Sequence, residues 1–182
     1  MQIVYVHGKS GSAGESEHYK PLFPNDEVIG LDYHTFSPWE TGVEIRAAVD
    51  ELARKHEDIC LIANSIGAFF SMNAGLDGLI QKAREIIHTE FGEDLSWEYL
   101  SYVRSHPIKW NVPTQILFGE KDQLTSLATM KDFVEKYHAG LTVMENGEHW
   151  FHTEEQMAFL DDWIRRENTE CLYNAQRPCR LR

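Results

Sequence analysis

Residues 59–70 constrain the fold more than any other part of this chain. An apolar run rich in Ile and Leu stops at Ser65, and a helical pattern begins at once. The run is too short for a core helix and is typical of a strand buried on both faces. A strand that turns sharply into a helix at a serine places the hydroxyl on an exposed, strained corner. That corner is also a helix N-terminus, where free N–H groups and the helix dipole favour the negative charge that develops in nucleophilic attack on an acyl carbon.

The residues around Ser65 form a known motif. Residues 63–67 read Ala-Asn-Ser-Ile-Gly and resemble the G-x-S-x-G nucleophile elbow of the α/β-hydrolase family, with Ala63 in place of the first glycine. The flanking positions must be small because the strand and the helix approach closely there. A serine between small residues at such a junction is more often a helix N-cap, so the motif needs support from the rest of the chain.

A second motif follows the first predicted strand, residues 2–7. This strand ends in a His-Gly pair and continues into a Gly/Ser-rich loop, residues 7–14. A phosphate-binding loop is excluded because the G-x-x-x-x-G-K-[ST] spacing is not present. A strand that leads into His-Gly resembles the oxyanion loop of α/β-hydrolases. This resemblance implies that the backbone N–H groups of Lys9 and Ile66 bind the oxyanion.

The rest of the chain alternates between strand and helix patterns. Capping boxes at Ser37 and Thr41 start a helix whose apolar residues recur at helical spacing as far as Ala53. Strand, helix and strand within this length predict parallel strands joined by right-handed crossovers. We therefore expect an α/β fold with a mostly parallel sheet flanked by helices. The further predicted elements are strands at 27–32, 112–119 and 141–145, and helices from Ser65 to about Ile80, at 126–138 and from Thr153 onward.

Two regions depart from this pattern. Residues 83–111 offer only a weak strand at 84–89 and an aromatic helix at 96–103, so we expect a reduced cap or insertion region and a strand that is missing or replaced after the nucleophile helix. The aromatic helix is interpreted equally well as a small cap over the active site or as surface packing. Residues 168–182 predict a mobile C-terminal tail after a single α/β-hydrolase domain, residues 1–167. The usual leading hairpin of the family is expected to be absent.

Ser65, Asp122 and His149 occur in the order that α/β-hydrolases use. A serine is a weak nucleophile unless a base accepts its proton and a third group orients that base. In the family, the serine, the acid and the histidine follow one another along the chain, each after a strand. Here Asp122 follows the strand at 112–119 in Gly-x-x-Asp, and His149 follows the strand at 141–145 in Gly-x-His. The resemblance thus implies a triad of nucleophile, acid and base.

Other residues compete for these roles. Glu120 is a rival acid that falls close to the end of its strand, and His152 is a rival base that directly precedes the predicted cap residue Thr153. A zinc site formed by Glu148, His149 and His152 is a further alternative, although the helical H-E-x-x-H pattern is absent. The remaining histidines are interpreted as structural or exposed: His7, His18, His34, His56, His88, His106 and His138.

Composition narrows the range of partners. The 29 acidic residues outnumber the 17 basic ones, and the net charge of −12 argues against nucleic acid and anionic membranes. No apolar stretch approaches the length of a membrane span, and the first strand lacks the basic region of a signal peptide. Three cysteines are an odd and sparse set, so we expect a reducing, cytoplasmic location. Exposed sheet edges would allow a homodimer.

The motifs together resemble a small carboxylesterase or lipase-like serine hydrolase. We expect cleavage of small-molecule carboxylic esters, with small or medium acyl groups, through an acyl-enzyme on Ser65 and without a cofactor or metal. Aspartate-dependent dehalogenases are excluded by the serine, whereas thioester, peptide and carbon–carbon bond cleavage stay open because the cap sets specificity. The alternative is a catalytically inactive hydrolase-fold binding protein or shortened form, because the loss of one strand would shift the triad by about 4.8 Å.

Overall fold

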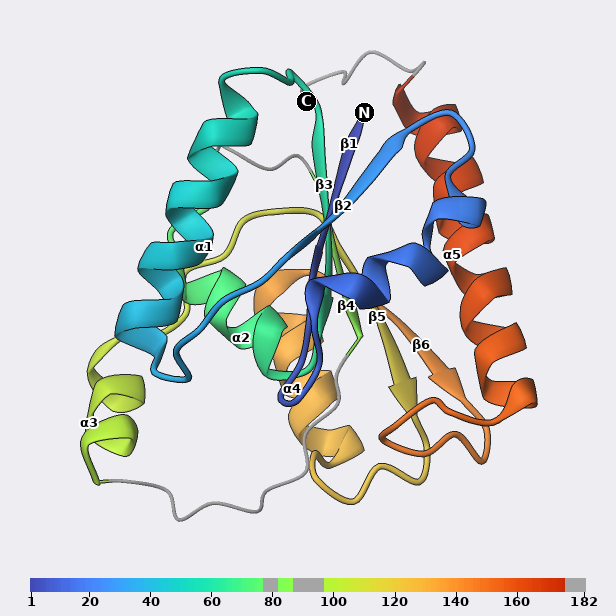
Figure 1. Ribbon diagram of the computed structural model, residues 1–182. Coiled ribbons are helices and arrows are strands. Elements are labelled where there is room, and N and C mark those ends of the chain that lie inside the picture. The colour runs from blue at the N-terminus through green and yellow to red at the C-terminus, as the bar shows by residue number, and fades with distance from the viewer. Residues whose placement is uncertain (77–81, 87–96, 176–182) are drawn as a thin grey trace, which may run out of the picture.

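The computed structural model of the protein describes residues 1–76, 82–86 and 97–175. Its centre is a six-stranded sheet with the order β2-β1-β3-β4-β5-β6, in which all neighbouring strands are parallel (Figure 1). The α/β fold with a parallel sheet predicted from the sequence is therefore confirmed. The strands are β1 (Gln2–Val6), β2 (Glu27–Leu31), β3 (Ile59–Asn64), β4 (Lys82–Ile86), β5 (Thr114–Gly119) and β6 (Gly140–Met144).

The chain enters the sheet near its middle and then reverses direction across it. From β1 it crosses to β2 on one side, returns to β3 on the other side, and then adds β4, β5 and β6 outward in sequence order. In open parallel sheets, such a reversal leaves a crevice at the carboxyl ends of the two strands that flank it, and ligands bind there. The loop after β1 and the turn after β3, which carries Ser65, meet at this point.

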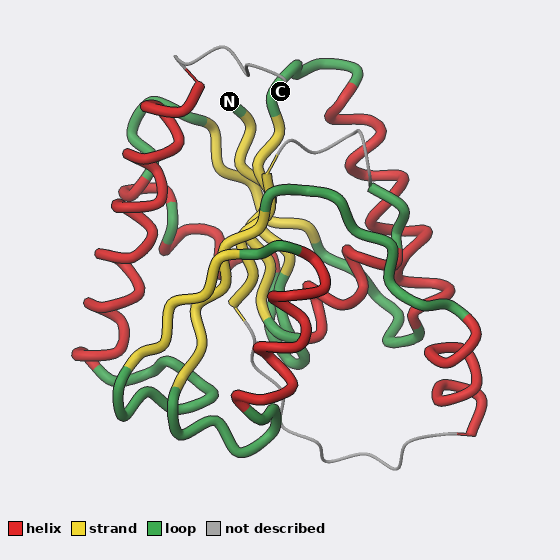
Figure 2. The backbone as a smooth tube through the Cα atoms, turned by 180° about the vertical axis from the view of Figure 1, so that it is seen from behind, coloured by secondary structure: helices red, strands yellow, loops and turns green. Residues whose placement is uncertain are grey.

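Helices cover both faces of the sheet (Figures 1 and 2). Strand β3 shows why, because its side chains alternate between the two faces. Leu61 and Ala63 pack in one core cluster with residues of α1 and α2, whereas Cys60 and Ile62 pack in a second cluster with residues of α5. The elements on the first face are α1 (Pro38–Ala53), α2 (Ile66–Asn73) and α4 (Leu127–Tyr137), and those on the second are α5 (Glu154–Ala175) and the short helices η1 (Ala13–His18) and η2 (Lys20–Leu22).

Helix α3 (Trp97–Ser105) belongs to the region expected to form a reduced cap. Its Tyr99 ring stacks on Phe69 of α2 with centroids 6.2 Å apart, and its Tyr102 ring lies 5.3 Å from Trp39 of α1. Aromatic contacts of this kind hold α3 against the two helices of the first face. Residues 87–96 of the same region lie outside the described residues.

Strand β4 is present where the sequence predicts a missing or replaced strand, so that expectation is wrong. Its backbone pairs with β3, where Asn64 lies opposite Ile86, and with β5, where Leu117 lies opposite the same residue. Two regular neighbouring strands offer hydrogen-bonding groups on both sides, and this pairing overrides a weak intrinsic strand preference. The strands before Ser65 and Asp122 consequently keep their usual spacing.

Two helices end at positions that differ from the predicted ones. Helix α2 stops at Asn73 and not near Ile80, because Gly75 has a φ of 66°, the left-handed conformation that terminates helices. Helix α5 continues to Ala175, so the predicted tail at 168–182 begins inside this helix, and residues 176–182 lie outside the described part. None of the described helices is both long and apolar enough to cross a membrane.

Candidate active site

Ser65 occupies the tight turn between β3 and α2. Its φ of 55° and ψ of −126° form a combination that residues with a side chain rarely adopt, at a cost of roughly 1–3 kcal/mol. The turn leads directly into the first turn of α2, where the Ala68 N–H donates to the Ser65 carbonyl oxygen over 2.9 Å. A strained serine at a strand-to-helix turn is the geometry of a nucleophile elbow. The strain expected from the sequence is confirmed.

Gly67 shows why the positions beside Ser65 must be small. A Cβ atom at Gly67 would lie 2.3 Å from the carbonyl oxygen of His7 and 2.9 Å from that of Val6. Both distances are far below van der Waals contact with backbone atoms, so only glycine lets α2 approach the end of β1. The close packing expected around the elbow is confirmed at this position.

The Ser65 side chain is buried, so the expectation of an exposed corner is wrong. Only 3% of the residue is exposed. The loop after β1 lies directly against it, since a Cβ atom on Gly8 would be 3.2 Å from the Ser65 Cβ. Ser65 Oγ makes no hydrogen bond to the residues that the structure describes.

Asp122 and His149 form a hydrogen-bonded pair in the loops after β5 and β6. Asp122 Oδ2 lies 2.6 Å from His149 Nδ1, and the side chains are 1% and 10% exposed. Asp122 Oδ1 accepts backbone N–H groups from Leu124 (2.7 Å) and Thr125 (3.0 Å). Burial would raise the pKa of Asp122, but the hydrogen bonds from His149, Thr125 and Leu124 outweigh it and lower the pKa below its usual value. The ionised carboxylate only accepts, so Nδ1 carries the proton and Nε2 is the basic atom of the neutral ring.

The two loops that carry this pair are bonded to each other. The Lys121 N–H donates to the Gly147 carbonyl oxygen over 2.7 Å, and the Glu120 N–H donates to the Met144 carbonyl oxygen over 3.0 Å. A Cβ atom on Gly119 would lie 2.3 Å from the Glu148 carbonyl oxygen, so glycine at the end of β5 permits this approach. The alignment of Asp122 with His149 thus depends on main-chain contacts as well as on their own hydrogen bond.

The rival residues have other partners. Glu120 Oε2 accepts the Asn146 N–H over 2.9 Å and so stabilises the turn before His149. His152 Nδ1 lies 2.7 Å from the Trp150 carbonyl oxygen and 3.6 Å from Glu148 Oε2 at the surface. Within the described ranges, no three His, Cys, Asp or Glu side chains group as a metal site, so Glu148, His149 and His152 do not form one.

Ser65 and His149 lie at the same edge of the sheet without a hydrogen bond between them. Ser65 follows β3 and His149 follows β6, so β4 and β5 separate their strands. The Oγ atom has no hydrogen-bond partner among the described residues, which excludes a formed bond to Nε2 in this structure. Catalytic hydrogen bonds in unliganded enzymes are often long and shorten only when substrate is bound.

The predicted oxyanion donors belong to the two segments next to Ser65, the loop after β1 and the start of α2. Ile66 is the first residue of α2, and its N–H belongs to the free N-terminal group of that helix. Lys9 lies in a turn closed by a 3.2 Å bond from the Gly11 N–H to the Gly8 carbonyl oxygen, with Ser10 at a φ of 63°. The sequence reasoning missed Asp32 and Tyr33, which contact His7 behind this turn. Their position at the end of a predicted strand was the signal in the sequence, but it does not report that this strand pairs with β1.

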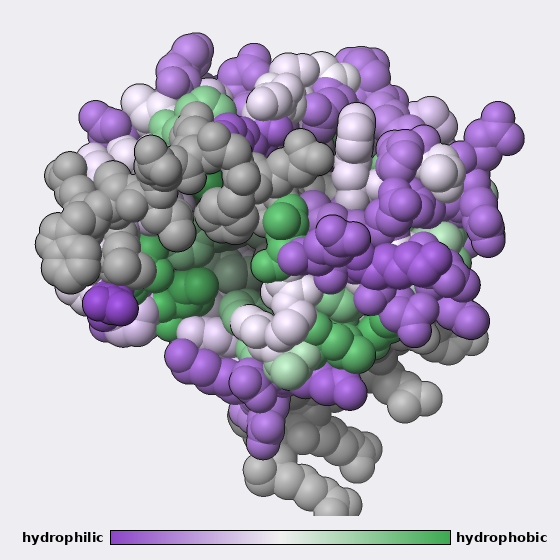
Figure 3. Space-filling view, turned by 90° about the horizontal axis from the view of Figure 1, so that it is seen from below, coloured by the Kyte–Doolittle hydropathy of each residue, from purple (hydrophilic) through white to green (hydrophobic). Residues whose placement is uncertain are grey.

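The carboxyl edge of the sheet, which faces the viewer in Figure 3, is hollowed, and apolar side chains line part of the hollow. Two large apolar residues in the loops of this edge are exposed: Phe36 after β2 (46%) and Trp150 after β6 (64%). A concave surface lined in part by apolar side chains is typical of a small-molecule site.

A separate cavity of about 330 Å³ lies between α1, α3 and the end of α2. Asn73 and Ala74, at the opposite end of α2 from Ser65, belong to its lining, together with Trp39 and Tyr102. The eight residues of α2 span about 12 Å, so this cavity is remote from Ser65. We therefore do not assign it to the candidate active site.

Comparison with known proteins finds similar structures but no similar sequence. A scan against models of protein families finds no match, and a search of curated proteins finds no matching sequence. Solved structures do match. Est1E from Butyrivibrio proteoclasticus superposes with a TM-score of 0.76 at 15% identity, over 94% of this chain and 88% of that chain.

Two further structures agree with this match. The esterase Est2 from Thermogutta terrifontis has a TM-score of 0.68 at 13% identity, over 100% of this chain and 85% of that chain. An alpha-beta serine hydrolase homologue from Coxiella burnetii has a TM-score of 0.65 at 14% identity, over 92% and 84%. At such low identity the likeness concerns the fold of the backbone alone. The chain has the α/β-hydrolase fold.

Proposed function

We propose that the protein is a serine hydrolase that cleaves carboxylic esters through an acyl-enzyme on Ser65. The observation that carries this proposal is the 2.6 Å Asp122–His149 pair, located at the same sheet edge as a serine in a strained strand-to-helix turn. A cap or a core serine needs neither the strain nor an oriented imidazole at the same sheet edge. The esterases and serine hydrolases among the similar structures support the same chemistry.

The reaction follows from the roles of these groups. His149 Nε2 takes the proton of Ser65 as Oγ forms a bond to the ester carbonyl carbon, and Asp122 stabilises the imidazolium. The N–H groups of Lys9 and Ile66 stabilise the oxyanion, each by about 3–4 kcal/mol in comparable sites. Collapse breaks the bond to the alcohol, which takes its proton from His149. Water, deprotonated by His149, then releases the acid and restores Ser65.

The proposed substrates are esters with small or medium acyl groups. Apolar side chains line part of the hollow at the carboxyl edge (Figure 3), and the exposed Phe36 and Trp150 lie in loops of the same edge. The Thermogutta esterase Est2 has a structure with bound butyrate, a four-carbon carboxylate in the proposed size range. A panel of esters with graded acyl length measures this preference directly.

An organophosphorus probe tests the nucleophile. Esterase 2 of Thermogutta terrifontis is phosphorylated by paraoxon, and we expect paraoxon or a fluorophosphonate to modify Ser65 in this protein. The Ser65→Ala variant should lose labelling and about 10⁶-fold in kcat. Ser71→Ala is the matched control, because Ser71 is a buried serine of the adjacent helix α2 that donates to the Gly67 carbonyl oxygen. Full ester hydrolysis by Ser65→Ala would refute the proposal.

The second candidate is a catalytically inactive hydrolase-fold binding protein. The observation in its favour is that Ser65 Oγ has no hydrogen bond to the described residues. The strand-loss argument for inactivity no longer applies, because β4 occupies the place between β3 and β5. Absence of both labelling and hydrolysis in the folded wild-type protein would favour this second candidate.

A further inference from the structure

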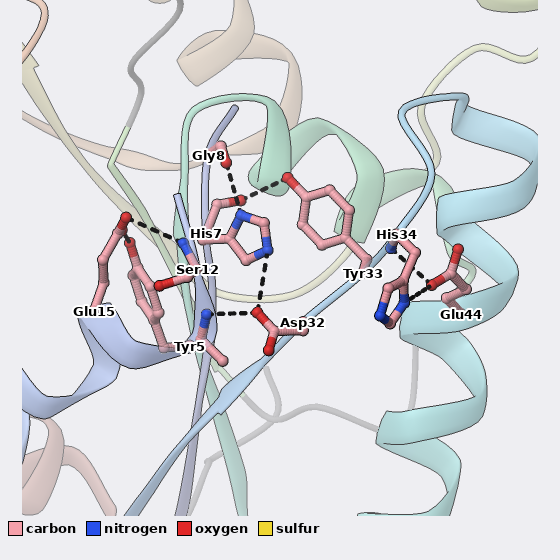
Figure 4. Close-up of polar contacts among 10 residues, drawn as sticks. Tyr5, His7, Gly8, Ser12, Glu15, Asp32, Tyr33, His34 and Glu44 are labelled. Atoms are coloured by element: carbon pink, nitrogen blue, oxygen red, sulfur yellow. Dashed lines mark hydrogen bonds and ion pairs between the residues drawn. The ribbon is translucent and has the colours of Figure 1, made fainter. Parts of the chain in front are cut away.

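His7, which takes no part in the proposed reaction, lies directly behind the loop that carries the Lys9 N–H. His7 is 3% exposed, and its ring stacks on Tyr33 with centroids 4.2 Å apart and an interplanar angle of 3° (Figure 4). The Tyr33 hydroxyl donates a 2.8 Å hydrogen bond to the His7 carbonyl oxygen. Burial raises the pKa of Tyr33, so this hydroxyl keeps its proton at ordinary pH. One tyrosine thus holds both the ring and the main chain of His7.

The His7 ring also contacts the next peptide group. Its Nδ1 atom lies 2.7 Å from the Gly8 carbonyl oxygen (Figure 4). A carbonyl oxygen only accepts, so Nδ1 carries the proton and donates it. The same oxygen accepts the Gly11 N–H over 3.2 Å. Two donors therefore fix the direction of the Gly8 carbonyl group.

Peptide geometry transmits this restraint to Lys9. The Gly8 C=O and the Lys9 N–H belong to one planar trans peptide group, so they point in opposite directions. Fixing the carbonyl oxygen fixes the direction of the N–H. Rotation of this peptide group would turn the Lys9 N–H away from an oxyanion that forms on Ser65. The close contact of Gly8 with Ser65 leaves little tolerance for such a rotation.

A weaker contact links His7 to the far end of the loop. Its Nε2 atom lies 3.8 Å from Asp32 Oδ1, and that oxygen accepts the Ala13 N–H over 2.7 Å. The first separation is too long for a hydrogen bond, whereas the second is a short one. Asp32 therefore holds Ala13 by itself, and the Nδ1 bond is the contact through which His7 acts on Lys9.

We propose that His7 is a positioning residue, which orients the Lys9 N–H for oxyanion stabilisation through its Nδ1 bond to Gly8. The inference rests on the proposed function, because it concerns a donor to the oxyanion. A correctly directed N–H matters when charge develops on the substrate oxygen, so its loss should lower kcat and leave KM nearly unchanged.

Two amide substitutions separate this role from packing. In His7→Asn the side-chain nitrogen can take the place of Nδ1, whereas in His7→Gln it lies further out, near the place of Nε2. We expect kcat to fall about 10- to 100-fold in His7→Gln and His7→Leu, and His7→Asn to stay within about threefold of wild type. Val49→Ala, a variant of the buried core of α1, controls for a general loss of stability.

A trifluoromethyl ketone supplies a second readout, because its adduct with Ser65 carries a tetrahedral oxyanion. Its affinity should weaken across the variants by the same factor as kcat. Equal kcat in His7→Asn and His7→Gln, or unchanged ketone affinity in His7→Leu, would overturn the inference and leave the proposed function intact. A wild-type protein that neither hydrolyses esters nor forms the adduct would overturn the proposed function, and this inference with it.

Discussion

The two halves of the candidate site are held by different kinds of force. Asp122 and His149 are aligned by a charge-assisted hydrogen bond and by backbone N–H groups that bind the carboxylate. Ser65 is held in a strained backbone conformation by packing so close that Gly67 cannot carry a side chain. The comparison teaches that a change in the first half should affect mainly the chemistry, whereas a change in the second half should affect folding more strongly.

After the loss of the nucleophile itself, the largest expected effect comes from a change in the half that holds Asp122 and His149. Asp122→Asn keeps the shape of the acid but offers His149 an amide, which favours the wrong tautomer. We expect kcat to fall about 10⁴-fold with little loss of ester binding, as in comparable triads. Steady-state kinetics on a short-chain ester measures this effect. Glu120→Gln is the matched control, and a comparable loss there would assign the acid role to Glu120.

The next effect concerns packing in the nucleophile half. Gly67→Ala places a methyl group 2.3 Å from the His7 carbonyl oxygen, and we expect it to lower the free energy of unfolding by about 1–3 kcal/mol. Gly42→Ala is its control in α1, where the nearest atom would be 3.6 Å away and the added methyl should stabilise the helix by about 0.5–1 kcal/mol. Denaturant titration of both variants gives these values. Equal stabilities would show that the elbow tolerates a Cβ atom at position 67.

A smaller effect should come from the strain itself. Ser65→Gly removes the side chain that makes the φ of 55° unfavourable, so we expect the variant to be inactive yet more stable by about 1 kcal/mol. Ser65→Ala keeps a Cβ atom and should not show this gain. Thermal unfolding of the two variants side by side measures the difference. If Ser65→Gly were no more stable than Ser65→Ala, the backbone conformation of Ser65 would not be destabilising.

The smallest effect is on stability in acid. The pKa of Asp122 is lowered in the folded protein below its ordinary value of 3.8, so its ionised form stabilises the fold above about pH 4. This contribution is lost as the pH falls through the folded pKa. The difference in unfolding free energy between wild type and Asp122→Asn should therefore be constant at neutral pH and shrink below pH 4. Glu145→Gln is the control, because Glu145 is exposed. If the unfolding free energy of this variant differed from wild type with an equally steep pH dependence, the effect could not be assigned to the Asp122–His149 pair.

Much of this architecture could be predicted because its signals are local. Ser65, Asp122 and His149 each follow a predicted strand, and carboxyl ends of parallel strands meet at one edge. The Asp122–His149 contact follows from that placement. Strand β4 could not be predicted with the same ease, because its pairing depends on β3 and β5, which are distant in sequence. Tertiary context decides such a segment and its own residues do not.

The burial of Ser65 and the contacts of His7 were not predictable for a related reason. Both depend on how closely the loop after β1 approaches the elbow, and a His-Gly pair predicts the loop without its distance from Ser65. His7 follows β1 and Tyr33 follows β2, and these two strands are neighbours only in the folded sheet, so the stacking of the two rings depends on the fold. Sequence patterns report periodicity along one element, and these contacts run across elements.

The bonds between the loops after β5 and β6 have a consequence for how such a chain can change. Lys121 is hydrogen-bonded to Gly147 and Glu120 to Asn146, and the backbone of Glu148 leaves no room for a side chain at Gly119. An inserted or deleted residue in either loop would disturb its partner at the same time. Variation in length should therefore accumulate elsewhere in the protein, and these two loops should be inherited and transplanted as a single unit.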